Sequence, residues 1–110
     1  MDLDLNSGLV QFMLKLENMH SVIEAAEHAL EMDEELWPQL VSTMSNLDIL
    51  HAGGVNPLHR IDPVQVHTLT GFARRNYRAI CADLSGNLER YSIEVMQESQ
   101  IIFVVCTAVP

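Results

Sequence analysis

The residue best placed for chemistry is Asp83, which ends a short apolar run over residues 79–82. The small-residue turn Ser85-Gly86 follows it. An apolar run of this kind predicts a buried strand of a parallel sheet covered by helices. The carboxylate then lies at the C-terminal edge of the sheet, where open α/β folds bind their ligands. The sequence therefore predicts that Asp83 lies at a ligand-binding edge.

The rest of the chain predicts the elements that position this edge. Two helix starts stand out. Ser21 with Glu24 is a capping-box pattern, and Asp62-Pro63 supplies an N-cap followed by a proline in the first turn. The second helix has a predicted buried stripe of Val66, Leu69, Phe72 and Ala73. The remaining predicted elements are short helices over 9–16 and from 36 to about 44, a strand over 47–51, a helix from 88 to about 98 and a strand over 101–106.

This order of strands and helices predicts the fold class. Strands that alternate with helices form parallel sheets with right-handed crossovers. We expect an α/β fold with three layers and a mostly parallel sheet, in a single domain over residues 1–110. The chain opens where a strand would end, at Asp2, so we expect it to be a part of a longer domain.

Composition narrows the function classes. The formal charge of −9 argues against a nucleic-acid backbone or an anionic membrane as the main partner. The longest apolar run, over 101–106, is far shorter than the roughly 20 residues of a membrane-spanning helix. Cys81 and Cys106 lie in predicted strands and are expected to be reduced, buried thiols of a cytosolic protein. His51, His59 and His67 recur every eight residues but lack metal-ligand partners at suitable spacing, so we do not predict a metal site there.

Two motifs resemble a known family. Residues 1–5, Met-Asp-Leu-Asp-Leu, resemble the apolar strand ending in D-x-D of the ParA/MinD class of P-loop ATPases. Residues 83–87, Asp-Leu-Ser-Gly-Asn, resemble the Walker B end of that class. Element by element, the chain is similar to the CpaE subgroup, which is linked to pilus assembly and polar localisation in bacteria. The resemblance covers nearly all of the chain but only the middle of such an ATPase.

The resemblance implies roles for individual residues in binding ATP and Mg²⁺. Asp4 matches the acid that orients or activates the attacking water, and Asp2 matches its partner beside the metal shell and the phosphates. Asp83 matches the Walker B acid that holds Mg²⁺, and Gly86 lies in the nucleotide-binding turn. Positioning and charge neutralisation supply most of the rate in phosphoryl transfer, which suits three carboxylates at strand ends. The implied parent is a cytoplasmic homodimer, held at the inner membrane or cell pole through pilus-assembly or localisation proteins.

The chain departs from the family pattern at the phosphate loop. No G-x-x-x-x-G-K-[ST] motif occurs, and Lys15 is the only lysine. Ser85 stands where the family often has proline. The first strand with its phosphate loop is thus missing, and these 110 residues alone are not expected to hydrolyse ATP.

Two other interpretations stay open. The chain can be a degenerate, non-catalytic α/β interaction module that acts as an assembly or localisation partner. A receiver-like regulatory domain is a weaker fit, because the lysine expected on a late strand of that fold is absent.

The resemblance also implies a difficulty for a fragment. In the family's sheet the strand with the phosphate loop lies beside the Walker B strand, so its absence leaves residues 79–82 without a neighbour on one side. This predicts low stability of the isolated chain or pairing with another chain.

Overall fold

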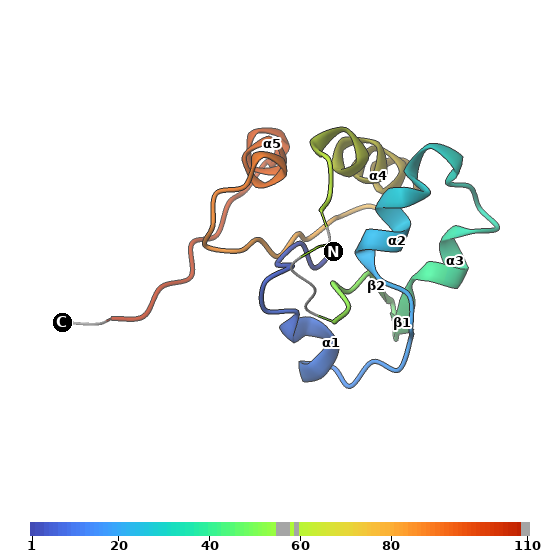
Figure 1. The fold of residues 1–110 in the computed structure, drawn as a ribbon, viewed down its shortest axis with the longest axis horizontal. Helices are drawn as coiled ribbons and strands as arrows, with labels where there is room; N and C mark the ends of the chain where they lie inside the picture. Colours follow the sequence, from blue (N-terminus) through green and yellow to red (C-terminus); the bar gives the residue numbers. More distant parts are fainter. Residues whose placement is uncertain (55–57, 59, 109–110) are drawn as a thin grey trace.

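The computed structural model describes residues 1–54, 58 and 60–108, and these residues form a mixed α/β structure (Figure 1). Within the described ranges there are five α-helices, one 3₁₀ helix and two strands. In chain order they are α1 (Leu9–Met13), α2 (Val22–Glu27), η1 (Ala29–Glu31), α3 (Trp37–Leu40), β1 (Ser42–Met44), β2 (Leu47–Ile49), α4 (Pro63–Asn76) and α5 (Arg90–Glu98).

Helix α4 is the longest element and begins where the sequence predicts. The Asp62 side chain accepts a hydrogen bond from Val64 N–H (2.8 Å), and Asp62 N–H donates to Gln65 Oε1 (3.0 Å). This reciprocal capping satisfies two backbone donors that a helix start leaves free. The predicted stripe is confirmed, since its four residues are all buried: Val66, Leu69, Phe72 and Ala73.

The core forms where α4 packs against α2, η1 and α5. Trp37 of α3 closes one end of it, with its ring centroid 5.2 Å from that of Phe72. Leu3 and Leu50 bring two non-helical segments into the same core, each at most 1% exposed. In Figure 1 the helices α4 and α5 therefore cover the segments that carry Asp2 and Asp83.

The sheet is smaller than the sequence predicts. β1 and β2 form an antiparallel hairpin in the register Ser42↔Ile49, Thr43↔Asp48 and Met44↔Leu47. The predicted helix to about Met44 is wrong beyond residue 40, because residues 42–44 pair with β2 instead. In the described part of the chain the parallel pairing is one isolated bridge, between Asp2 and Asp83.

The apolar segment 101–106 does not form the predicted strand. It leaves the end of α5 and runs away from the body of the molecule (Figure 1). Its exposed side chains range from Ile102 at 54% to Val105 at 94%. Cys81 and Cys106 are also exposed, so the prediction of buried thiols is wrong.

Candidate functional site

The site begins with the backbone of Met1–Leu3, which lies between two other segments. Asp2 N–H donates to Leu50 O (2.9 Å) on one side. On the other side Asp83 N–H donates to Met1 O (2.9 Å) and Leu3 N–H donates to Asp83 O (2.8 Å). These bonds bring together two acids that are 81 positions apart in the sequence, in a parallel pairing. The sequence predicted this neighbourhood from strand ends.

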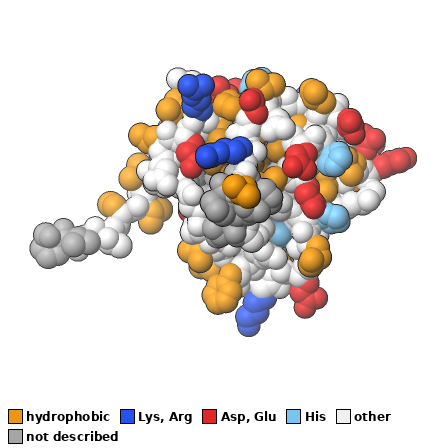
Figure 2. Space-filling model, viewed as in Figure 1, with side chains coloured by type: hydrophobic (Ala, Val, Ile, Leu, Met, Phe, Trp, Pro, Cys, Tyr) orange, Lys and Arg blue, Asp and Glu red, His pale blue; other side chains and the backbone are white. Residues whose placement is uncertain are grey.

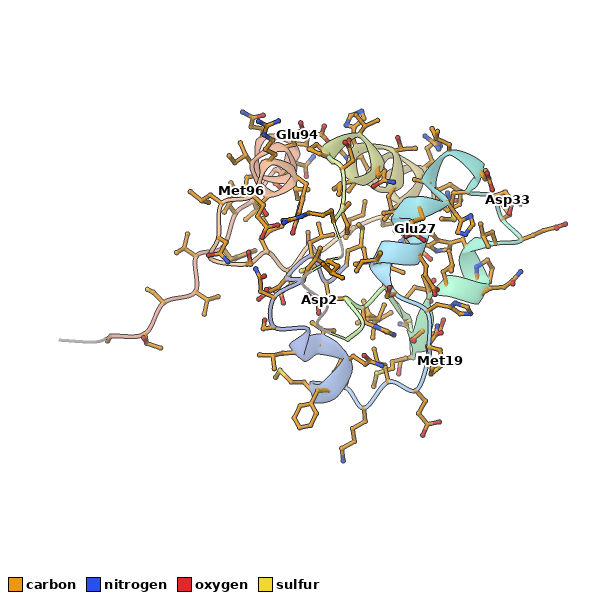
Figure 3. All side chains as sticks on the ribbon, in the orientation of Figure 1. Asp2, Met19, Glu27, Asp33, Glu94 and Met96 are labelled. Carbon is orange, nitrogen blue, oxygen red and sulfur yellow. The ribbon has the colours of Figure 1, made fainter. Side chains whose placement is uncertain are left out.

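Asp2 is buried, with 1% of its surface exposed, and lies in the middle of the molecule (Figure 3). Its Oδ1 accepts a hydrogen bond from Asp4 N–H (3.0 Å), while Oδ2 has no partner among the described residues. Burial raises the pKa of the Asp2 carboxyl, and the charges of Asp83 and Asp4 raise it further against the opposing hydrogen bond. The positive charge that interacts with an ionised Asp2 here is the Met1 ammonium group, which itself donates to Cys81 O (2.7 Å).

Asp4 lies at the start of a turn rather than in an open crevice. Its Oδ1 accepts from the backbone N–H groups of Asn6 (3.2 Å) and Ser7 (3.3 Å), and its Oδ2 accepts from Ser7 Oγ (2.5 Å). Aspartate commonly closes turns in this way. Asp4 therefore stabilises the turn that leads into α1. To orient a water molecule, one of its carboxylate oxygens would have to accept a further hydrogen bond from that water.

The segment after Asp83 is open to solvent. Asp83 itself is exposed, and Ser85 Oγ bonds both Asn87 N–H (3.2 Å) and Asn87 O (3.1 Å), which closes the turn. Gly86 lies in this turn with open space around it, since a Cβ there would meet no atom within 4 Å. The turn leads into α5, where the Tyr91 hydroxyl donates to Leu3 O (3.3 Å). Helix α5 is thereby tied to the segment Met1–Leu3, which carries Asp2.

Among the described residues no group of three or more His, Cys, Asp and Glu side chains is arranged to hold a metal ion. His51 accepts Gly53 N–H at Nδ1 (3.0 Å), so its proton is on Nε2, which donates to Asn18 O (2.8 Å). His67 contacts Glu98 (2.8 Å). His59 lies outside the described residues. The role of Asp83 as Mg²⁺ ligand, and the roles of Asp4 in orienting water and of Asp2 in supporting the site, stay predictions.

Two surface hollows lie beside α1 and α2 rather than at the three acids. The larger, of about 610 Å³, is lined by α1, the turn before it and Gly53-Gly54. The smaller, of about 310 Å³, lies between α2 and the same glycines. Gly53 has φ 77°, and a Cβ there would lie 2.9 Å from Ser21 Cβ. The sequence did not single out this position, although glycine is favoured where the backbone has positive φ or approaches a neighbour closely, as it does at Gly53.

Sequence reasoning missed a chain of polar contacts behind the hairpin. The Tyr77 hydroxyl donates to Asp48 and accepts from Trp37 Nε1 (2.6 Å), and Thr43 Oγ1 donates to Asp48 (2.6 Å). Burial, followed by the hydrogen bond with Asp48, raises the pKa of Tyr77. These contacts tie β1 and β2 to the end of α4. The available signal was the polar Asp48 between two apolar residues of the predicted strand, Leu47 and Ile49.

No protein-family model, no curated protein and no solved structure matches this chain. No helix in the part of the chain that the structure describes is long and apolar enough to cross a membrane. The function proposed below therefore depends on the arrangement of the chain's own residues.

Proposed function

We propose that this chain is the central part of a CpaE-like ATPase of the ParA/MinD class. The whole protein would bind Mg-ATP, hydrolyse it and use the cycle as a positional or assembly switch, while the 110 residues alone would be inactive. The proposal includes a three-layer, mostly parallel sheet, to which Met1–Leu3 and Cys81–Asp83 would contribute neighbouring strands. The observation that supports it is the parallel pairing of Asp2 with Asp83.

The buried carboxylate of Asp2 fits a neighbouring cation. Its Oδ2 has no partner among the described residues, and two further acids raise its pKa. A divalent cation would offset this repulsion, and Mg²⁺ is commonly bound through one or two carboxylates together with phosphate oxygens. When bound, Mg²⁺ would neutralise phosphate charge. In this proposal Asp83 holds the metal, Asp2 supports it, Asp4 orients water and Gly86 lets the nucleotide approach the turn.

The partners follow from the same proposal. The parent would form a homodimer and work with pilus-assembly or polar-localisation proteins in the cytoplasm, or at the inner membrane through those partners. Asp4→Ala in the longer protein would abolish ATP turnover and leave ATP binding mostly intact. An in-frame, Gly-rich, Lys-containing loop roughly 25–35 residues upstream in the source DNA would supply the phosphate site.

The 110-residue chain itself can be tested with Mn²⁺, a paramagnetic ion that accepts the same oxygen ligands as Mg²⁺. At millimolar Mn²⁺ we expect selective broadening of the amide NMR signals of residues 2–4 and 83–86. Asp83→Asn should remove most of this broadening, because it removes the exposed carboxylate next to Asp2. The side chain of Asp83 makes no hydrogen bond in the described part of the chain, so the variant should fold normally.

Glu94→Gln is the matched control, because Glu94 is an exposed acid on α5 and lies away from Asp2 (Figure 3). This variant should keep the broadening. Broadening that instead centres on the acidic run 33–35, or that is unchanged in Asp83→Asn, would contradict the proposed metal position.

A second candidate function is a non-catalytic interaction module. The observation that favours it is the exposed apolar segment Ile101–Val105, since exposed apolar surface of this kind marks sites of protein association. Selective Mn²⁺ broadening at the three acids would favour the ATPase. If this broadening is absent and the chain associates with itself, the non-catalytic interaction module is favoured.

A further inference from the structure

In the part of the chain that the structure describes, the segment Cys81–Asp83 is hydrogen-bonded on one side only. Cys81 O accepts from the Met1 nitrogen (2.7 Å), and both backbone groups of Asp83 bond to Met1–Leu3. Successive residues of an extended segment direct their backbone groups to opposite sides. Ile80 and Ala82 therefore direct theirs away from Met1–Leu3, and these groups have no hydrogen-bond partner among the described residues. The segment pairs with Met1–Leu3 through one isolated bridge, and its other side presents an open edge to which a strand can add.

The segment Ile101–Val105 has the complementary properties. It is a continuous run of β-branched and aromatic residues, the composition that favours strands. Its side chains are 54–94% exposed, and its backbone makes no hydrogen bond in the described part of the chain. It is therefore a strand-forming segment without a neighbour.

Within one chain the two segments do not meet. Helix α5 is fixed to α4 by Arg74, which donates to Glu98 O (3.0 Å) and forms an ion pair with the Glu98 carboxylate (3.3 Å). Ser99 N–H and Oγ bond back to the last turn of α5. The segment Ile101–Val105, hereafter the tail, therefore begins next to an anchored helix end and extends away from the body of the molecule (Figure 1).

We propose that two copies of this chain exchange tails, so that Ile101–Val105 of each copy adds as a strand to the open edge at Ile80–Ala82 of the other. Adding a strand to an open edge satisfies backbone groups on both sides and buries apolar side chains. Each copy carries one edge and one tail, so the exchange closes as a symmetric dimer. This dimer does not depend on the proposed ATPase function.

The distribution of charge favours pairing of the open edge with the tail of a second copy rather than with an acidic surface of that copy. The chain carries a net charge of −9, yet no charged residue occurs after Glu98. The edge segment is preceded by Arg78 and is apolar over residues 79–82. Pairing of these two segments avoids contact between carboxylates. Because the two copies still repel one another at longer range, added salt should strengthen the dimer.

The test is the oligomeric state of the 110-residue chain in reducing buffer, measured by sedimentation over a concentration series. We expect a monomer–dimer equilibrium for the unaltered chain. Val104→Lys in the tail and Ala82→Pro at the edge should each raise the dimer Kd at least about tenfold. Ile80→Lys is a second edge variant, in case Ala82→Pro lowers the thermal stability. Leu30→Lys places the same charge on an exposed apolar residue of η1 and should leave the Kd unchanged.

Mixing Val104→Lys with Ala82→Pro distinguishes tail exchange from non-specific hydrophobic association. Val104→Lys keeps an intact edge, and Ala82→Pro keeps an intact tail. An equimolar mixture should therefore form heterodimers with a lower Kd than either variant shows for its homodimer. A monomeric unaltered chain, a dimer that survives both variants, or a mixture without heterodimers would overturn the proposal. A monomer in which the amides of Ile101–Val105 are protected from exchange would show that the tail folds back onto its own edge, which also overturns it.

Discussion

Two extended segments of this molecule differ in how far they are buried. Met1–Leu3 is short and carries an acid, yet Asp2 and Leu3 are buried to 1% exposure or less. Ile101–Val105 is longer and wholly apolar, yet more than half of each side chain is exposed (Figure 2 shows apolar side chains along the extended tail). The difference is in the backbone. Met1–Leu3 has hydrogen-bonding neighbours on both sides, whereas the tail has none among the described residues.

This contrast shows that apolar composition alone does not place a strand in the core. A strand is stable only when its backbone groups are paired, and that pairing comes from other segments. Leu50 and Asp83 supply it for Met1–Leu3. The free energy gained by this pairing offsets the cost of burying the Asp2 carboxylate, whose second oxygen has no partner in the described part of the chain.

The largest expected difference is between two phenylalanines. Phe72 packs against Trp37 and is 7% exposed, while Phe103 of the tail is 84% exposed. Phe72→Ala should destabilise the fold by about 3–5 kcal/mol, because it removes buried apolar surface and leaves a cavity. Phe103→Ala should change the stability of the dilute monomer by less than about 0.5 kcal/mol. Urea unfolding at low protein concentration measures both, and similar losses would place the tail in the core.

A smaller effect is expected at Asp2. Because the pKa of Asp2 is raised in the folded state, its protonated form is favoured by folding, and this contribution is lost as the pH rises above the usual aspartate range. Asp2→Asn should therefore stabilise the fold at pH 7 by about 1 kcal/mol, through removal of a buried unpaired charge. The gain should shrink toward zero in acid, where Asp2 is itself protonated.

The control for this pH dependence is Glu34→Gln, which removes one negative charge at an exposed position. It should change stability little at any pH between neutral and acid. A gain for Asp2→Asn that is equal at all pH values would show that it does not come from removal of a charge. A loss of stability at pH 7 would show that the Asp2 carboxylate has a stabilising partner.

Local signals predicted part of this fold well. The start of α4 depends on Asp62, Pro63 and Gln65, which lie within four positions, so the sequence contains the whole cause. The capping box at Ser21 was predicted from the same kind of pattern, but no side-chain bond caps α2 there. Glu24 instead contacts His20 (2.6 Å). A short polar side chain has several partners within reach, and the pattern does not choose between them.

Non-local pairing accounts for the parts that the sequence did not predict. The strand β1 exists because residues 42–44 pair with β2, although their own pattern extended a helix. The tail has the strongest strand pattern in the chain and makes no backbone hydrogen bond to any other described residue. For the candidate site, strand ends and the family resemblance placed Asp2 near Asp83. The burial of Asp2 depends on the packing of Leu3 and α5 above it, which no short motif encodes.

Amide hydrogen exchange of the dilute monomer tests the central contrast most directly. The amides of Leu3 and Asp83, which bond across the parallel pair, should exchange slowly, with rates set by opening of the fold. Those of Val104 and Val105 should exchange as fast as in an unstructured peptide. Slow exchange in the tail of the monomer, or fast exchange at both Leu3 and Asp83, would contradict the conclusion that Met1–Leu3 is paired through its backbone and that the tail is not.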